Sequence, residues 1–418
     1  MPDFACGDSA LSLRLESATI RTNRFMSGQV RGGGTRAPHA ESKASAGLHA
    51  VAGALTQYAR RKGVRNTWTE RQSRKNPYLV YWIEASVYHP RHRGSYREMG
   101  FHYGDLLYRH GFRLPPQSPT AVKFGRQSET EVRRVFPQIL EEIRGFAEAC
   151  RSSYDELLSF VLMIGVEEKS FKCSIFATVD DRHVIFGRNY DFFYKYKDYT
   201  ESSLTVPDGG YSSIGHSDVF IGKEDGVNEK MLAIGMTFVG PVLVRPGINF
   251  PIVVRYVLDR CSNVKQAIQS LRKIRYSTTN NYLLADASGD LAVVEASPRM
   301  VNIRTPSADS GYIACTNHFV TKKMLEMEDL SLRSSDSLRR YYSIGKGIRQ
   351  VNGRLGHKQA EKILSDNLGG VCSHRSDLRM GTLWSFIADL REQRVTTAEG
   401  HPCRTEYRED LRLRRLAA

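Results

Sequence analysis

The 418-residue chain is 41% hydrophobic and 25% charged, which is ordinary for a soluble globular protein. It has no apolar run of about 18 residues, so no membrane-spanning helix is expected, and its N-terminus lacks the apolar stretch of a secretory signal. The formal net charge is +15, but residues 1–76 alone hold 13 Lys/Arg against 5 Asp/Glu. These residues include few aromatics for base stacking, so specific nucleic-acid binding is not expected.

The seven cysteines are widely spaced and form no C-x-x-C pair; they are Cys6, Cys150, Cys173, Cys261, Cys315, Cys372 and Cys403. An odd, dispersed set argues against a disulfide framework. Free thiols in a reducing compartment are the simpler interpretation, and we expect a cytoplasmic location.

The first part of the chain differs from the rest. Residues 1–76 include the Gly/Ser/Ala/Arg-rich stretch "SGQVRGGGTRAPHAESKASAG", which shows no apolar periodicity. We expect a disordered basic extension here. Its Arg-rich, acid-poor character also resembles a transit peptide, but a dispensable extension is the preferred interpretation.

Folded sequence is predicted to begin with a strand over 76–89, where aromatic and β-branched residues cluster. Residues 129–149 have apolar side chains at helical spacing, and Pro137 predicts a kink or a new first turn there. Residues 153–165 open with Ser and Asp and predict another helix.

From Cys173 onward the apolar period becomes that of strands. Strands are predicted over 227–240 and 281–298, the latter with a Ser-Gly turn at its centre, and Ser262-Asn263 predicts a cap between helices in 250–274. Further helices are predicted over 334–351 and 357–368. This order favours an α+β protein with antiparallel sheet layered against helices rather than a βαβ repeat.

The stretch "FKCSIFATVDDRHVIFGRNYDFF" (171–193) predicts a hairpin around Asp181-Arg182. Antiparallel pairing then places Cys173 opposite Tyr190, with Asp191 one step beyond. Arg188 lies on the diagonal to Cys173, within reach of a long side chain. A thiol, a guanidinium and a carboxylate therefore converge at one end of the hairpin.

This group is chemically useful only if the thiol is activated, because a free cysteine has a pKa near about 8.5. A cut before Cys173 would turn its α-amine into a base that titrates near about 7.7 to 8.0. Asp191 would then orient the amine and Arg188 would support the thiolate. A buried structural cysteine beside a surface Arg/Asp pair is the alternative that spacing alone leaves open.

The same residues resemble the N-terminal nucleophile hydrolases of the choloylglycine hydrolase and penicillin acyltransferase type. Members have a nucleophilic Cys that opens a strand and a Gly-Arg-Asn-x-Asp run one hairpin later, here Cys173 and Gly187–Asp191. Family-like segments also occur in order over about 77–418: "GSYREMGFHYGDLL", "GVNEKMLAIG", "NYLLADASGDLAVVEASP", "CTNHF", "DSLRRY" and "GTLWSFIADL". The closer branch is similar to acyl-coenzyme A:6-aminopenicillanic acid acyltransferase-like amidases.

The resemblance implies a four-layer αββα sandwich, with 77–172 as a mostly helical pro-segment or α chain and 173–418 as the catalytic domain. It implies that Cys173 is the nucleophile, that its α-amine is the base, and that Asp191 and Arg188 line the site. Asn281 matches the family's oxyanion donor, although the adjacent Asn280 could be the true match. Supporting positions match Ser337 and Arg340.

Two positions depart from the family pattern. Relatives that cleave themselves often have Gly before the nucleophile, where this chain has Lys172. Because Gly adopts strained backbone most easily, this difference puts self-cleavage in question. Met231 replaces the usual Gly of the N-E-x-G-L run, which we interpret as a packing change.

Metal sites find little support in the sequence. Cys315 lies close in sequence to His318, and Cys372 lies close to His374. No further Cys or His stands at a spacing that would join either pair into a four-ligand zinc site. We interpret Cys315 and Cys372 as structural and expect neither metal nor cofactor.

Three functions follow from the resemblance. The first is hydrolysis of a linear carboxamide through a thioester acyl-enzyme. The second is transfer of the same acyl group to an amine, and the third is binding by a silent scaffold. The expected partner is a small acyl-amide, and self-cleavage would give an α/β heterodimer. The acyl and amine specificities are not encoded in any motif that we can place.

Overall fold

The computed structural model describes residues 88–417 except 167–171, 308–309, 334–335 and 352–353. The predicted disordered extension (1–76) and nearly all of the predicted strand over 76–89 lie outside the described residues. The described chain begins with the short strand β1 (Arg91–Gly94).

Four helices follow β1: α2 (Tyr96–Arg109), α3 (Pro119–Val135), α4 (Pro137–Ala149) and α5 (Tyr154–Leu162). Pro137 is the first residue of α4, as predicted, because proline fits the first turn of a helix. Helices α2 and α4 pack closely through Gly100 and Gly145. A Cβ at Gly100 would lie 1.9 Å from the backbone oxygen of Glu142, so no larger residue fits there.

The strands form two sheets. One has the order β1-β4-β5-β6-β7-β8-β9-β10, and the other has the order β11-β2-β3-β13-β14-β15 with β12 paired to β13. Apart from the parallel pair β1–β4, neighbouring strands are antiparallel. The bounds in the first sheet are β4 (Glu201–Pro207), β5 (Ser213–Ser217), β6 (Asp225–Asn228), β7 (Leu232–Phe238), β8 (Asn280–Asp286), β9 (Leu291–Ala296) and β10 (Val301–Arg304). Those in the second are β2 (Lys172–Val179), β3 (Val184–Phe193), β11 (Tyr312–Cys315), β12 (His374–Arg375), β13 (Met380–Asp389), β14 (Arg394–Ala398) and β15 (Arg408–Glu409).

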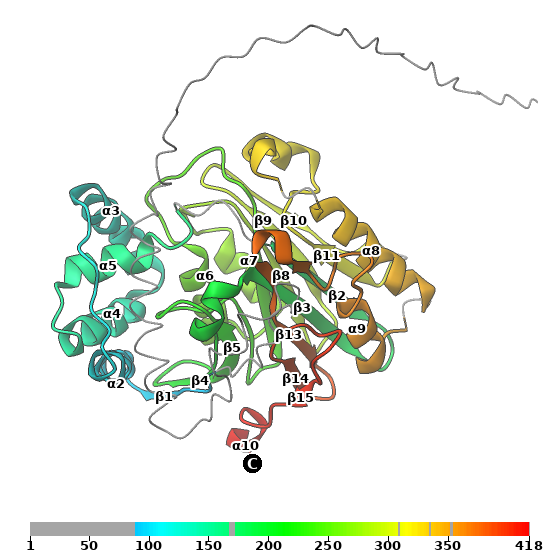
Figure 1. Cartoon of the computed structure of the whole chain (residues 1–418), viewed down its shortest axis with the longest axis horizontal. Coiled ribbons are helices and arrows are strands. Elements are labelled where there is room, and N and C mark those ends of the chain that lie inside the picture. Colours follow the sequence, from blue (N-terminus) through cyan, green and yellow to red (C-terminus); the bar gives the residue numbers. More distant parts are fainter. Residues whose placement is uncertain (1–87, 167–171, 308–309, 334–335, 352–353, 418) are drawn as a thin grey trace, which may run out of the picture. The chain divides into compact units, whose positions relative to one another are not determined.

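Helices cover the outer faces of both sheets (Figure 1). Helices α6 (Phe250–Arg260) and α7 (Val264–Leu271) pack on the first sheet, and α8 (Ser337–Gln350) and α9 (His357–Leu364) pack on the second. The inner faces meet where Gly235 of β7 approaches Ile175 and Phe186. The predicted four-layer αββα sandwich is therefore confirmed. Short helices complete the chain at Tyr194–Tyr199, Lys322–Met327, Leu330–Leu332, Ser376–Leu378 and Arg414–Ala417.

The predicted single strand over 227–240 is wrong, because this stretch turns at Glu229-Lys230 and contributes to both β6 and β7. Met231 closes the turn with φ 56°. This left-handed conformation favours Gly, so the departure at Met231 is a backbone feature and not the packing change that we expected.

The helices before Cys173 are joined to α6, which packs on the first sheet, by buried polar contacts. Tyr96 donates a hydrogen bond to Asp259 (2.9 Å), and Arg255 forms an ion pair with Glu142 (3.1 Å). Strand β1 adds backbone pairing to β4. Residues on the two sides of Cys173 therefore share one packed structure.

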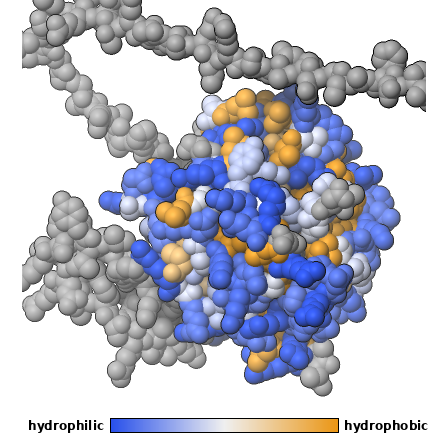
Figure 2. Space-filling model, turned by 90° about the vertical axis from the view of Figure 1, so that its right-hand side faces the viewer, coloured by the Kyte–Doolittle hydropathy of each residue, from blue (hydrophilic) through white to orange (hydrophobic). Residues whose placement is uncertain are grey.

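Figure 2 shows a face of the molecule that is mainly hydrophilic, with hydrophobic residues in separate patches. Among the described residues, no helix is both long enough and apolar enough to cross a membrane. All six cysteines in the described part of the chain are free thiols.

Candidate active site

The hairpin β2–β3 has the predicted register. Cys173 pairs with Tyr190, Lys172 pairs with Asp191, and Arg188 lies opposite Ile175. Cys173 is the second residue of β2 and has no exposed surface. The predicted convergence of thiol, guanidinium and carboxylate at one end of the hairpin therefore exists in the folded chain.

Each polar atom of Cys173 has a partner from a different segment. Its N–H donates to Oδ1 of Asn317 (2.8 Å), and its carbonyl oxygen accepts a hydrogen bond from Nη1 of Arg340. Its Sγ lies 3.6 Å from Nη2 of Arg188. The backbone on both sides of the thiol is thus held in place while Sγ contacts a cation.

The thiol of the uncleaved chain is protonated at neutral pH. Burial raises the pKa of Cys173 to about 12, although the Arg188 guanidinium opposes this shift. Asp191 and Glu224 raise the pKa further through their negative charge. Nucleophilic attack therefore requires a base that removes the proton.

Arg188 is buried in a polar network that the sequence analysis missed. It donates hydrogen bonds to Asp225 and to the carbonyl oxygen of Met236 (3.1 Å), and Glu224 lies 3.7 Å away. Asp225 also accepts a hydrogen bond from the indole of Trp384 (2.9 Å). These contacts fix the guanidinium beside Sγ.

Asp191 has one occupied and one free carboxylate oxygen. Oδ1 accepts a hydrogen bond from the hydroxyl of Thr382 (2.6 Å), whereas buried Oδ2 has no hydrogen-bond partner among the residues that the structure describes. Burial raises the pKa of Asp191 from 3.8 to about 7, and the Arg340 guanidinium opposes this shift. The free oxygen can bind a proton or accept a hydrogen bond from an ammonium group.

Replacing Asp191 with Asn is expected to stabilise the uncleaved chain at alkaline pH. Because the folded-state pKa is raised, the native chain retains a proton between pH values of about 4 and 7 that the unfolded chain releases. Native stability therefore falls as the pH rises through this interval. At about pH 8, Asp191→Asn should raise the free energy of unfolding by about 1 to 3 kcal/mol, with little effect at about pH 4. The free energy of unfolding is measured by urea denaturation at several pH values, in proteins that also carry Cys173→Ala. If it changes equally with pH with and without Asp191→Asn, the prediction is wrong.

The two adjacent asparagines of β8 face opposite sides of the sheet. Asn281 pairs with Thr237, which shares the face of Gly235 toward the second sheet, so Asn281 lies on the same side as Cys173. Asn280 faces the other way, and its Oδ1 accepts a hydrogen bond from Thr278 (3.1 Å).

Asn281 does not present a free amide to Cys173. Its Nδ2 lies within hydrogen-bond distance of Thr237 Oγ1 (3.0 Å) and the carbonyl oxygens of Thr316 (3.0 Å) and His318 (3.1 Å). Thr316 and His318 flank Asn317 in the chain. Asn281 therefore holds the segment that carries Asn317.

Asn317 is the asparagine that touches Cys173, and the sequence analysis missed it. Its Oδ1 accepts hydrogen bonds from Cys173 N and from Arg340 Nη2 (2.9 Å). Its Nδ2 donates to the carbonyl oxygen of Phe238 (2.9 Å), which uses one of two N–H groups. The signal in the sequence is the family-like run "CTNHF", in which Asn317 lies between the Cys and His that the sequence analysis considered as ligands.

Ser337 and Arg340 both lie on α8. Arg340 contacts Cys173 directly, whereas Ser337 contacts the segment that carries Asn317. Ser337 contacts His318 Nδ1 (2.8 Å) and Thr316 Oγ1 (3.0 Å), so it braces the Asn317 segment. Arg340 contacts Cys173 directly and lies 3.4 Å from Asp336.

Lys172 also contacts Asp336, the neighbour of Arg340, because its Nζ lies 3.1 Å from the Asp336 carboxylate. Lys172 is the first residue of β2, and the extended backbone of a strand is accessible to every residue type. The residue before the candidate nucleophile thus has a conformation that does not require Gly.

A family model described as acyl-coenzyme A:6-aminopenicillanic acid acyl-transferase matches residues 178–404, more than half of the chain. The match begins after Cys173 and includes Arg188, Asp191 and Asn317. A search of curated proteins finds no significant match.

Three solved structures are similar to parts of this chain. A Caenorhabditis elegans ortholog of N-acylethanolamine-hydrolyzing acid amidase has 16% identity and a TM-score of 0.40, covering 52% of this chain and 93% of its own. Conjugated bile acid hydrolase from Clostridium perfringens has 13% identity and a TM-score of 0.39 (57% and 96% covered). Penicillin V acylase from Agrobacterium tumefaciens has 17% identity and a TM-score of 0.37 (54% and 82% covered). With more than half of its residues matched by the family model, the chain belongs to the acyl-coenzyme A:6-aminopenicillanic acid acyl-transferase family.

Proposed function

We propose that this protein is a cysteine amidase that cleaves linear carboxamides through a thioester at Cys173, after cutting its own chain before that residue. The observation that carries the proposal is the set of contacts around Cys173. Asn317, Arg340 and Arg188 hold its N–H, its carbonyl oxygen and its Sγ, respectively. A purely structural cysteine needs no such arrangement.

The proposed self-cleavage begins with attack of Sγ on the carbonyl carbon of Lys172. The C–N bond to Cys173 breaks, and the nitrogen leaves as a free α-amine after it gains the thiol proton. Asp191 would relay that proton: the residue pairs with Lys172 across the two strands, and its Oδ2 has no hydrogen-bond partner among the described residues. Water then hydrolyses the thioester, which releases the Lys172 carboxylate and restores the thiol.

In the mature enzyme the α-amine would serve as the general base for the thiol, because its pKa of about 7.7 to 8.0 suits neutral pH. Oδ1 of Asn317 already contacts this nitrogen in the uncleaved chain. Asp191 would hold the ammonium form. Arg188 would stabilise the thiolate that attacks the substrate carbonyl.

We assign the oxyanion donor to Asn317 rather than to Asn281, on the strength of their hydrogen bonds. Both N–H groups of Asn281 are occupied by three nearby acceptors, whereas Asn317 retains one N–H and adjoins Cys173. An amide donor placed at the developing oxyanion is worth about 3 kcal/mol. Asn281 and Ser337 would position Asn317.

After cleavage the two products are expected to remain associated as a heterodimer. The described helices before Cys173 are held to the rest by β1–β4 pairing and by the buried Arg255–Glu142 ion pair. Separation would expose these groups and the apolar surface around them.

Acyl transfer to an amine is the second candidate function, because the matching family is described as an acyltransferase. Both reactions share one acyl-enzyme, which water resolves in one case and an amine in the other. The two reactions differ only in which nucleophile reaches the thioester first.

A partition experiment tests the amidase proposal and separates these outcomes. Fatty-acyl and phenylacyl amides of aminocoumarin are incubated with mature enzyme, with and without 6-aminopenicillanic acid. Release of free acid in both mixtures supports hydrolysis, and an acylated acceptor indicates transfer. Labelling of Cys173 by an acyl-like alkylating probe, unchanged in a Cys261→Ala control, locates the nucleophile. If Cys173 is neither labelled nor acylated, the silent-scaffold hypothesis replaces the amidase.

A further inference from the structure

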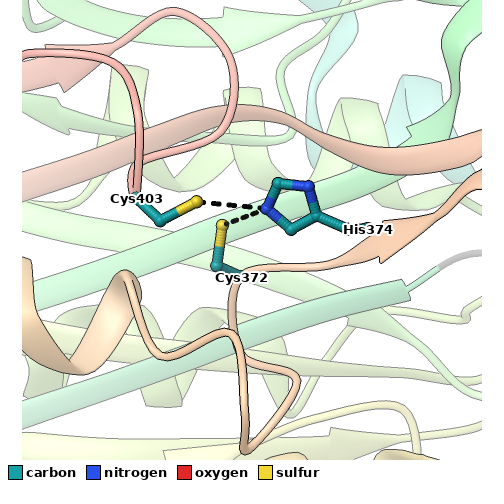
Figure 3. Close-up of side chains that lie close together, drawn as sticks. All are labelled: Cys372, His374 and Cys403. Carbon is teal, nitrogen blue, oxygen red and sulfur yellow. Dashed lines mark hydrogen bonds between the residues drawn. The ribbon is translucent and has the colours of Figure 1, made fainter. Parts of the chain in front are cut away.

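Three side chains of types that can bind a metal lie close together, as Figure 3 shows: Cys372, His374 and Cys403. His374 opens β12, Cys372 lies two residues earlier, and Cys403 belongs to the segment after β14. Nε2 of His374 lies 3.3 Å from Sγ of Cys372 and 3.1 Å from Sγ of Cys403. All three ligand atoms lie within 4.8 Å of one another.

This geometry is close to that of a zinc site. Tetrahedral zinc with bonds of about 2.3 Å to sulfur and about 2.0 Å to nitrogen holds its ligand atoms about 3.5 to 3.8 Å apart. The nitrogen–sulfur separations here are shorter by only a few tenths of an ångström. Two thiolates and one imidazole are a ligand set that zinc prefers over harder cations.

We propose that Cys372, His374 and Cys403 bind a zinc ion, with water in the fourth coordination position. Among the described residues, this group contains three side chains that could bind a metal, two Cys and one His. The imidazole of His401 stacks on that of His374, with ring centroids 3.9 Å apart, and so restricts its rotation.

The site is connected to the candidate catalytic carboxylate through the backbone. Ser373, between two of the ligands, donates its N–H to Oγ1 of Thr382 (3.0 Å), which donates to Asp191 (2.6 Å). Zinc would join this segment to the chain around Cys403. It would thereby fix the hydroxyl that orients Asp191.

A disulfide between Cys372 and Cys403 is the competing use of the two thiols. The position of His374 favours the metal, because its nitrogen contacts both sulfurs and a disulfide needs no third ligand. The zinc proposal does not depend on the amidase proposal, since metal binding is measured without substrate.

Cobalt(II) loading of the reduced, full-length protein tests the proposal directly. We expect one equivalent of cobalt, visible bands of a tetrahedral thiolate–imidazole site, and their loss when zinc displaces the cobalt. Cys403→Ser and His374→Gln should each weaken zinc binding by more than about 100-fold in competition with a chelating dye. Cys261→Ser, which changes another buried thiol, and Cys173→Ala, which removes the candidate nucleophile, should bind as the wild type does.

The cobalt spectrum of the wild type keeps the test valid even if a ligand variant misfolds. Reduced wild type that binds neither metal stoichiometrically would overturn the proposal, as would an unchanged cobalt spectrum in Cys403→Ser. A Cys372–Cys403 disulfide in the purified protein, with no metal binding after its reduction, would assign the pair to redox chemistry instead.

Discussion

Purified wild-type protein is expected to consist of two chains, one ending at Lys172 and one beginning at Cys173, whereas Cys173→Ala remains a single chain. The thiol is the only group in the proposed mechanism that can attack the Lys172 carbonyl, so its removal should abolish cleavage. Intact mass and N-terminal sequencing of both proteins measure the result. Native mass spectrometry should show the two wild-type chains still bound to each other.

Two controls separate this explanation from cleavage by a contaminating protease. Cys261→Ala, which removes a buried thiol elsewhere, should mature normally. In a time course of purified precursor, the first-order rate should not depend on protein concentration. A wild type that stays whole on long incubation, or a Cys173→Ala protein cut at the same bond, would contradict self-cleavage.

Lys172 bears on whether this cleavage is feasible. The sequence analysis questioned self-cleavage because Gly is usual before the nucleophile. In the folded chain Lys172 begins a strand, and its ammonium pairs with Asp336 beside Arg340. We expect this ion pair to hold the scissile residue in place.

Local sequence patterns were enough to predict the hairpin that carries the candidate nucleophile. Strand pairing relates Cys173, Arg188 and Asp191 through one short turn, so the loop position alone determined their register. The predictions of a helix start at Pro137 and of a helix cap at Asn263 also depended on single residues, and both are confirmed. The hairpin over 227–240 was missed because its turn places Met231 where Gly would have signalled it.

The remaining parts of the candidate site come from distant segments. Asn317, Asp225 and Cys403 reach their partners only when the two sheets and the terminal segment pack together. No periodicity or spacing in the chain relates Cys403 to His374, so the sequence analysis left Cys372 and His374 as an isolated pair. The choice between Asn281 and Asn317 likewise depends on hydrogen bonds that the fold creates.

Asn317→Ala is expected to slow self-cleavage by about 100-fold to 1,000-fold, the range for loss of one oxyanion donor. Asn281→Ala should slow it by less than about tenfold and act mainly by lowering stability, because Asn281 contacts the Asn317 segment rather than Cys173. Self-cleavage is a suitable readout because each molecule cuts one bond of its own. Rates are measured by electrophoresis on precursor refolded from denaturant, with urea denaturation of each variant as the stability control.

Asn317→Asp distinguishes an oxyanion donor from a simple positioning residue. The carboxylate keeps the oxygen that accepts the Cys173 N–H and contacts Arg340, but it loses both amide N–H groups, the one that donates to Phe238 and the one that would stabilise the oxyanion. If donation matters, the Asn317→Asp variant should be as slow as the alanine variant although its fold is retained. If Asn317 only holds Cys173 in place, the Asn317→Asp variant should cleave near the wild-type rate, and the donor assignment would return to Asn281.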